Sequence, residues 1–318
     1  MGPCGTPLVV LLALFLALAC GEPSAAANNT RIVGVGTAAI PEGFDFDDAE
    51  FALHLAYASY CDPHIVKNWT CSWCSAAASW GVTVYGVAKS NKTQQSAYVA
   101  HIVGRGIVIS FRGTKSWQSW IYNLNFPITN LTWSGVAEGA GVHRGFLDAY
   151  NSIRSDLHAL FAQAQADCPL CEIWIVGHSL GAAEAALCAA DITVGPTKAK
   201  VDKFITFGSP RVGNAAWAAW FSDKVVPSTP DRSLRFVNNY DCVPHVPFSA
   251  LPGGRQQFHH VGTEIWQHPE AGVFTVCDGS GEDKNCSFQY SFKQAVESGR
   301  CKSDHLSYFQ QTETCHEG

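Results

Sequence analysis

A serine flanked by glycines stands near the middle of the chain, in the run Gly177-His178-Ser179-Leu180-Gly181. A continuously apolar run, Ile173-Trp174-Ile175-Val176, comes just before it, and an alanine-rich stretch follows. In a strand–turn–helix of this kind the glycines permit a sharp turn that exposes the serine hydroxyl at the end of the strand. The N–H groups and the positive dipole end of the helix then lie beside the reacting carbonyl oxygen. The run therefore predicts a nucleophilic serine, Ser179.

A serine hydroxyl becomes a good nucleophile when a base takes its proton and a carboxylate orients that base. After a turn of this type the groups follow in the chain order serine, acid, histidine. Asp241 closely follows a candidate strand at 234–238 and is the candidate acid. We expect three other aspartates to have no special role, on helix ends or in solvated stretches, namely Asp191, Asp202 and Asp223. The spacing leaves the base open among the histidines downstream of the acid, which are His245, His259, His260, His268 and His305.

The segments around these residues alternate between strand-like and helix-like patterns. Apolar and β-rich runs predict strands at 82–87, 97–103, 107–111, 173–176, 204–207 and 234–237. Helical patterns predict helices at 51–61, 145–166, 179–191 and 214–221. Strand–helix alternation is typical of parallel βαβ units. We therefore expect an α/β fold, with one domain at residues 46–318.

The composition and the N-terminus exclude several classes of protein. The 318 residues include 21 Lys and Arg against 27 Asp and Glu, a formal charge of -6, which argues against nucleic-acid binding. The apolar run 8–19 is shorter than the roughly 20 residues that span a membrane, and it predicts a signal peptide at 1–20. A buried N-terminal helix is the alternative. Residues 21–45 are expected to be a linker or pro-segment, and no later run predicts an integral membrane segment.

Cysteine usage agrees with a secreted, extracellular protein. Of 13 cysteines, Cys4 and Cys20 leave with the signal peptide, and the odd remainder of 11 implies at least one free thiol or an intermolecular bridge. Cys188, which lies among alanines, is the candidate for a buried free thiol. Two C-x-x-C pairs favour local disulfides over a zinc site: Cys71 with Cys74 and Cys168 with Cys171. Five N-x-S/T sequons also point to secretion: Asn28, Asn68, Asn91, Asn130 and Asn285.

Six short motifs follow one another between about Tyr60 and Cys315. They are I-S-F-R-G-T (109–114), V-H-R-G-F-L-D-A-Y (142–150), G-H-S-L-G (177–181), F-G-S-P-R-V-G (207–213), N-N-Y-D-C-V-P-H-V-P (238–247) and D-H-L-S-Y-F (304–309). Through these motifs the sequence resembles the class 3, fungal Rhizomucor-type lipases of the α/β-hydrolase superfamily. The resemblance implies an α/β-hydrolase fold, with a mostly parallel central sheet flanked by helices and a short helical lid.

The resemblance also assigns roles to residues. It implies Ser179 as nucleophile, Asp241 as orienting acid and His305 as general base. It further implies an oxyanion hole formed by the backbone N–H groups of Thr114 and Leu180, with the Thr114 hydroxyl as a third donor. This chemistry needs neither a metal nor an organic cofactor.

The family pattern suggests disulfide partners as well. Three pairs follow it: Cys61 with Cys315, Cys71 with Cys74, and Cys277 with Cys286. The Cys168–Cys171 pair departs from the pattern. So does Cys242–Cys301, which we infer because Asp241 and His305 must meet, so that their near neighbours come close as well.

The stretch after Thr114 matches the lid of the family. Its apolar residues fall at helical spacing: Trp117, Trp120, Ile121 and Leu124. Core packing of a short helix would produce the same spacing. In the family this helix lies over the active site, and feruloyl esterases tend to carry a polar segment there. The apolar version favours a lipase that acts at a lipid–water interface.

We therefore expect a secreted triacylglycerol lipase, a serine hydrolase that cleaves acylglycerol esters through an acyl-serine intermediate. Ala182 stands where many lipases of the group have a third glycine, so the acyl-chain preference stays open. One alternative is a feruloyl or other soluble-ester esterase of the same family. The other is a non-catalytic lipid-binding protein on a lipase scaffold.

Overall fold

The computed structural model describes residues 45–114, 127–250, 257–270 and 272–315. The predicted signal peptide and nearly all of the predicted linker lie outside these residues. So do the four predicted lid residues: Trp117, Trp120, Ile121 and Leu124.

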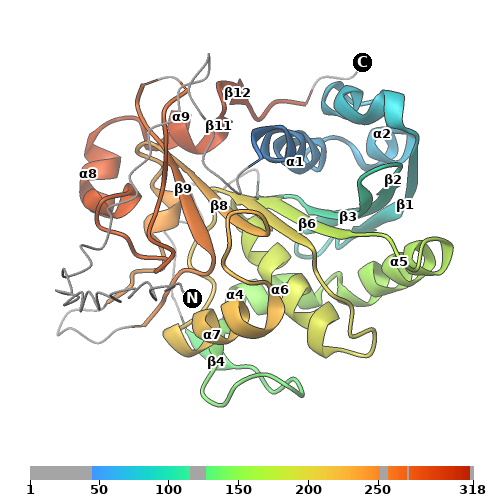
Figure 1. The fold of residues 1–318 in the computed structure, drawn as a ribbon, viewed down its shortest axis with the longest axis horizontal. Helices are drawn as coiled ribbons and strands as arrows, with labels where there is room; N and C mark the ends of the chain where they lie inside the picture. Colours follow the sequence, from blue (N-terminus) through green and yellow to red (C-terminus); the bar gives the residue numbers. More distant parts are fainter. Residues whose placement is uncertain (1–44, 115–126, 251–256, 271, 316–318) are drawn as a thin grey trace, which may run out of the picture.

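One large sheet runs through the described part of the chain, with its strands in the order β1-β2-β3-β6-β7-β8-β9-β10 (Figure 1). Its strands are β1 (Val82–Lys89), β2 (Ser96–Ile102), β3 (Gly106–Phe111), β6 (Ile173–His178), β7 (Lys203–Phe207), β8 (Ser233–Asn238), β9 (Thr263–Gln267) and β10 (Phe274–Val276). Two short antiparallel pairs stand apart from it: β4 (Ile128–Asn130) with β5 (Gly141–His143), and β11 (Ser307–Tyr308) with β12 (Gln311–Thr312).

The centre of the sheet is parallel. Strands β3, β6, β7, β8 and β9 pair in parallel, whereas the β1–β2–β3 edge and the β9–β10 edge are antiparallel. Phe111 pairs with Gly177, and His178 pairs with Phe207, so the carboxyl ends of β3, β6 and β7 meet at one edge. The predicted α/β architecture is confirmed.

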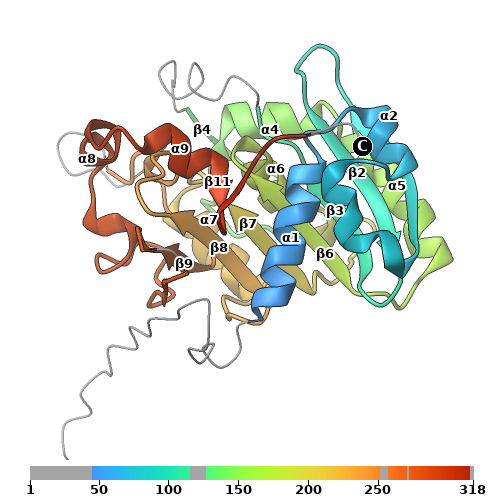
Figure 2. The same ribbon diagram turned by 90° about the horizontal axis from the view of Figure 1, so that it is seen from above.

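Helices cover both faces of the sheet. They are α1 (Phe46–Ala58), α2 (Pro63–Asn68), α4 (Arg144–Asn151), α5 (Arg154–Asp167), α6 (Leu180–Val194), α7 (Ala215–Trp220), α8 (Phe292–Glu297) and α9 (Cys301–Leu306). Short 3-10 helices are η1 (Ser72–Trp80), η3 (Val243–His245) and η4 (Ser287–Gln289), and a π-helical turn, η2 (Phe221–Val225), follows α7. Helix α1 crosses one face of the sheet, and α4, α6 and α7 cover the other (Figures 1 and 2).

Two apolar cores result from the alternation of side chains along each strand. Ile109 and Ile175 pack with α4, α5 and α6 on one face. Val108 and Trp174 point the other way and pack with α1. The sequence of a parallel strand that is buried on both faces is a continuous apolar run. This burial explains why the short run before Ser179 predicted β6 correctly.

The predicted helix 145–166 is wrong in one respect, because it is two helices. Helix α4 ends at Asn151 and α5 begins at Arg154. The Ser152 amide bonds back to the carbonyls of Asp148 and Ala149, which closes the last turn of α4. The break lets the two parts contact different partners, since α4 packs on α6 whereas α5 packs on β1 and β2. Apolar spacing continued across the break, so the sequence pattern did not reveal it.

Five disulfides join cysteines of the described residues, in the pairs Cys61–Cys315, Cys71–Cys74, Cys168–Cys171, Cys242–Cys301 and Cys277–Cys286. Within the described ranges, Cys188 is the free cysteine, and it is buried in α6 as expected. The helices of these ranges all lack the combination of length and apolar character that crossing a membrane requires.

Candidate active site

Ser179 lies in the turn between β6 and α6, at the carboxyl edge of the sheet. Its backbone has φ 60° and ψ -131°, a positive-φ conformation that residues other than glycine rarely adopt. The two glycines of the motif make this turn possible. A Cβ on Gly177 would lie 2.4 Å from the Gly181 carbonyl oxygen, and one on Gly181 would lie 2.4 Å from that of Phe111. Any larger residue at either position would push the helix away from the strands.

His305 connects Ser179 to Asp241. The Nε2 atom of His305 lies 2.9 Å from Ser179 Oγ, and its Nδ1 lies 3.0 Å and 2.9 Å from the two carboxylate oxygens of Asp241. All three side chains are buried. If Nδ1–H donates to Asp241, then Nε2 is the acceptor for the Ser179 hydroxyl, which is the tautomer a general base needs. The fold thus brings His305 against an acid 64 positions away and a serine 126 positions away in sequence.

Two further donors hold the Asp241 carboxylate. The Tyr308 hydroxyl donates to Oδ2 at 2.6 Å, and the Val243 amide donates to Oδ1 at 2.9 Å. Burial by itself would raise the pKa of Asp241. The charge and hydrogen bond of His305, with the bonds from Tyr308 and Val243, outweigh the burial and lower that pKa. Asp241 is therefore an ionised carboxylate at neutral pH, held in place for His305.

The neighbouring loops fix the positions of Asp241 and His305. Asn238, at the end of β8, donates through Nδ2 to the carbonyls of Asp304 and Ser307, at 3.1 and 2.5 Å. Asn239 Nδ2 donates to Asp304 Oδ2 at 2.9 Å. The Cys242–Cys301 disulfide joins the same two segments covalently. These links lie on either side of Asp241 and His305 in the sequence and limit the movement of both.

A second histidine supports the backbone of the first. His178 Nε2 lies 2.8 Å from the carbonyl oxygen of His305, and its Nδ1 lies 2.7 Å from the Tyr60 hydroxyl. Burial, and then the neighbouring His305, lower the pKa of His178 to about 3. His178 is thus neutral, with Nε2–H donating to His305 and Nδ1 accepting from Tyr60. It positions His305 without competing for the proton of Ser179.

A glycine opposite the triad leaves room for the Asp241–His305 contact. Gly208 follows β7 with φ 57°. A Cβ at this position would lie 2.8 Å from Asp241 Oδ2 and 2.9 Å from His305 Nδ1. Only glycine combines this φ with this clearance.

The predicted oxyanion residues lie on two sides of Ser179. Leu180 is the first residue of α6, so its N–H has no acceptor within the helix. Thr114 is half-buried and follows Gly113, where a Cβ would lie 2.9 Å from Ser179 Cβ. The end of β3 therefore passes close to Ser179. The predicted lid begins directly after Thr114 and lies outside the described residues.

The other candidate histidines bond elsewhere. His260 Nε2 lies 2.7 Å from the Pro244 carbonyl oxygen, His259 Nδ1 lies 2.9 Å from that of His260, and His268 Nε2 lies 2.6 Å from Thr275 Oγ1. The ring of His245 stacks on Phe288, and burial lowers its pKa to about 4. His305 is the candidate that contacts both Ser179 and Asp241.

Asp191 lies near the end of α6 and outside the triad, as expected, but the expectation that it has no special role is wrong, because it is 1% exposed and fully bonded. Tyr150 donates to it at 2.7 Å, Arg154 contacts both of its oxygens at 2.6 Å, and His158 Nε2 lies at 2.6 Å. It ties α6 to α4 and α5. Asp202 is half-buried and accepts the Ile173 amide, whereas Asp223 is exposed as expected.

Several residues that support the site were not foreseen in that role: Tyr308, His178, Tyr60 and Gly208. Tyr308 and Gly208 stood inside the motifs D-H-L-S-Y-F and F-G-S-P-R-V-G, and His178 stood inside G-H-S-L-G. Membership of a motif was thus a signal that pointed to three of them. Their contacts depend on the way distant segments meet, which the spacing of a motif does not reveal.

Residues 108–251 match the sequence model of a family described as Lipase (class 3). A lipase from Rhizomucor miehei is 30% identical over 279 residues, which cover 83% of this chain and 69% of that protein. A secreted mono- and diacylglycerol lipase A from Penicillium camembertii is 30% identical over 254 residues, which cover 77% of this chain and 78% of that protein. The solved structure of lipase II from Rhizopus niveus superposes with a TM-score of 0.74 at 26% identity, covering 89% of this chain and 98% of that chain.

Proposed function

The chain belongs to the class 3 lipase family, and we propose that it is a secreted lipase that hydrolyses the carboxylic esters of acylglycerols. Ser179 is the nucleophile, His305 the general base and Asp241 the group that orients His305. The observation that carries the proposal is the continuous line of contacts from Ser179 Oγ to His305 and on to Asp241, each between 2.9 and 3.0 Å.

The reaction proceeds in two halves. His305 Nε2 takes the hydroxyl proton as Ser179 attacks the ester carbonyl, and the imidazolium then gives that proton to the departing alcohol. Water repeats the attack on the acyl-Ser179 ester, again with His305 as base, and releases the fatty acid. The buried negative charge of Asp241 stabilises the imidazolium in both halves.

The oxyanion of each tetrahedral intermediate lies between α6 and the end of β3. The N–H groups of Leu180 and Thr114 and the Thr114 hydroxyl are its donors. The position of Leu180 at the helix N-terminus and the close approach of Gly113 to Ser179 support this assignment. Removing one such donor typically costs about 10²–10³ in rate.

The apolar residues after Thr114 form the lid that meets the lipid surface: Trp117, Trp120, Ile121 and Leu124. Their helical spacing and their position next to the segment that approaches Ser179 support this role. Residues 1–20 are the signal peptide and 21–45 a linker or pro-segment. Secretion and glycosylation are supported by the five disulfides and by the exposed sequon asparagines Asn68, Asn91, Asn130 and Asn285.

Substrate preference is the first prediction. Emulsified long-chain triacylglycerols should be hydrolysed with a kcat/KM at least about tenfold above that for soluble methyl ferulate, because an apolar lid is matched to an apolar acyl chain. The rate should also rise when a short-chain glyceride exceeds its solubility limit and forms droplets. Both rates are measured by continuous titration of the released acid.

Two results would contradict this prediction. Preference for the ferulate with no gain at the interface would favour the soluble-ester esterase. Lipid binding without turnover, together with no labelling of Ser179 by a serine-directed phosphonate, would favour the non-catalytic protein. A lid variant in which Trp117 and Trp120 are replaced by serine is the matched control. It should lose the interfacial gain while keeping hydrolysis of the soluble ester.

Replacement of Tyr308 by phenylalanine gives the second prediction. It removes the donor 2.6 Å from Asp241 Oδ2 and leaves the ring in place. We expect kcat/KM to fall by about 10- to 150-fold, since a hydrogen bond to a charged group contributes about 1.5–3 kcal/mol. The control is Tyr98→Phe, which removes a buried hydroxyl that bonds the Leu55 carbonyl. It should change the melting temperature but leave kcat/KM unaltered. Equal losses of kcat/KM in both variants would contradict a specific role for the Tyr308 hydroxyl in holding Asp241.

A further inference from the structure

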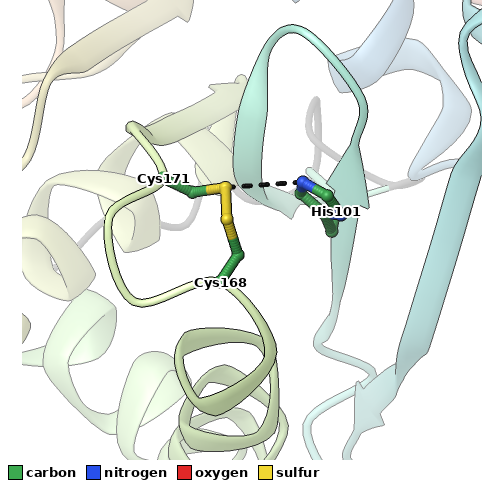
Figure 3. A group of neighbouring side chains, drawn as sticks. All are labelled: His101, Cys168 and Cys171. Atoms are coloured by element: carbon green, nitrogen blue, oxygen red, sulfur yellow. Dashed lines mark hydrogen bonds between the residues drawn. A yellow bond between two sulfur atoms is a disulfide. The ribbon is translucent and has the colours of Figure 1, made fainter.

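A second group of reactive side chains lies at the end of the sheet opposite Ser179. It comprises His101 in β2 and the Cys168–Cys171 disulfide, which follows α5 and precedes β6 (Figure 3). His101 Nε2 lies 3.4 Å from Cys171 Sγ. Because β6 runs from Ile173 to His178, a strand of that length places the two sites about 20 Å apart. The proposed hydrolysis makes no use of this group.

This disulfide is more accessible than the others. Cys168 and Cys171 are both half-exposed, whereas each of the other four disulfides of the described residues includes a buried cysteine. The intervening residues Pro169 and Leu170 are exposed, and Leu170 is 96% exposed. Thiol–disulfide exchange depends on access to the sulfur that is attacked. A soluble thiol should therefore open this pair before the others.

Reduction would produce a set of zinc ligands. The ligand atoms of His101, Cys168 and Cys171 lie within 4.8 Å of one another. In a tetrahedral site with Zn–S near 2.3 Å and Zn–N near 2.0–2.1 Å, the nitrogen and sulfur atoms are about 3.6 Å apart, and two sulfurs about 3.8 Å. The contact of 3.4 Å between His101 and Cys171 already has nearly the required length. The main change needed is that the two sulfurs separate once their bond is broken.

We propose that Cys168, Cys171 and His101 form a redox-gated site for Zn²⁺, closed to the metal as a disulfide and open to it as a dithiol. Two electrons and two protons from a dithiol reductant convert the disulfide to two thiols, and the reductant leaves as a disulfide. Zn²⁺ then displaces the two thiol protons and binds two thiolates and the neutral imidazole. Water takes the fourth position, because the site is open to solvent.

The site has a structural consequence. The disulfide connects the end of α5 to the start of β6, and the bound metal would restore that connection after reduction while adding a link to β2 through His101. A lipase that loses this covalent link in a reducing environment would keep its α5–β6 turn anchored when zinc is present.

The test compares zinc uptake before and after limited reduction of the full-length protein. A dithiol is added at a dose at which alkylation and peptide mapping detect thiols at Cys168 and Cys171, and it is then removed by gel filtration under argon. We expect about one Zn²⁺ bound per chain after reduction and no zinc at this site before it. Bound zinc should protect Cys168 and Cys171 from alkylation. Co²⁺ in its place should give thiolate-to-metal charge-transfer absorption.

Two variants and an internal control separate this site from general thiol binding. Cys168→Ser with Cys171→Ser should abolish the uptake, and His101→Ala should weaken it by at least about tenfold, since one of three protein ligands is lost. The matched internal control is Cys71–Cys74, which has the same C-x-x-C spacing but is buried and belongs to no ligand group of the described residues. Equal zinc uptake by the reduced wild type and the double serine variant would overturn the proposal. So would unchanged affinity in His101→Ala, or earlier reduction of Cys71–Cys74.

Discussion

Replacing Ser179 by alanine should lower kcat for glyceride hydrolysis by about 10⁶-fold, with the fold intact. Removal of the serine of a triad costs about this much, and the remaining rate over water comes from the oxyanion donors and substrate binding. The variant should fold because alanine removes only the hydroxyl and leaves the glycines of the turn in place. The hydrogen bond that it loses is the one to His305 Nε2. Titration of released fatty acid measures the loss, and thermal unfolding checks the fold.

A serine elsewhere on the protein provides the control. Ser75 is exposed and donates to the Ser72 carbonyl, far from the triad in sequence, so Ser75→Ala should retain full activity. A fluorescent phosphonate should label the wild type and Ser75→Ala but not Ser179→Ala. Full activity in Ser179→Ala would end the proposed mechanism. Labelling of another serine in that variant would show that the nucleophile is that serine and not Ser179.

The parts of the site that depend on local sequence could be predicted from it. The turn around Ser179 needs an apolar strand, two glycines and a following helix, and all of these are contiguous in the chain. Asp241 could also be predicted from the sequence, because parallel strands end at one edge of the sheet and the acid closely follows such a strand. His305 could not be predicted in this way, since it lies in α9, 64 residues beyond the acid. The spacing of the sequence did not distinguish it from the other histidines downstream of Asp241. Resemblance to a family, rather than local chemistry, selected it.

Contacts between distant elements account for what was missed. Asp191 lies near the end of α6, where a carboxylate is ordinarily solvated, yet Tyr150, Arg154 and His158 from α4 and α5 surround it. The break between α4 and α5 brings these three partners together. The apolar spacing of the sequence revealed neither the break nor the cluster around Asp191. The bonds from Tyr308 to Asp241 and from His178 to His305 likewise join segments that are 67 and 127 residues apart.

Replacing Asp241 by asparagine should lower kcat by about 10⁴-fold. The size of the side chain hardly changes, so the loss comes from charge and from hydrogen-bond direction. The carboxylate can only accept, and it therefore keeps the proton of His305 on Nδ1. An asparagine amide can donate to Nδ1 instead, which moves the proton to Nε2 and leaves no acceptor for Ser179. The buried imidazolium also loses its stabilising charge. Steady-state kinetics on a soluble ester and on a glyceride emulsion measure the effect.

Asp304→Asn separates this role from a general effect of negative charge near the base. Asp304 precedes His305 directly, and its carboxylate accepts from Asn239, the Tyr240 amide and Arg300. Burial raises the pKa of Asp304, in contrast to the lowered pKa of Asp241. The asparagine oxygen can still accept from Asn239 and Tyr240, which both donate to Oδ2, and only the contact of Oδ1 with Arg300 is lost. We therefore expect kcat to fall by less than about tenfold. If both variants lost activity equally, the orienting role of Asp241 would be wrong, and the two carboxylates would act only through their summed field.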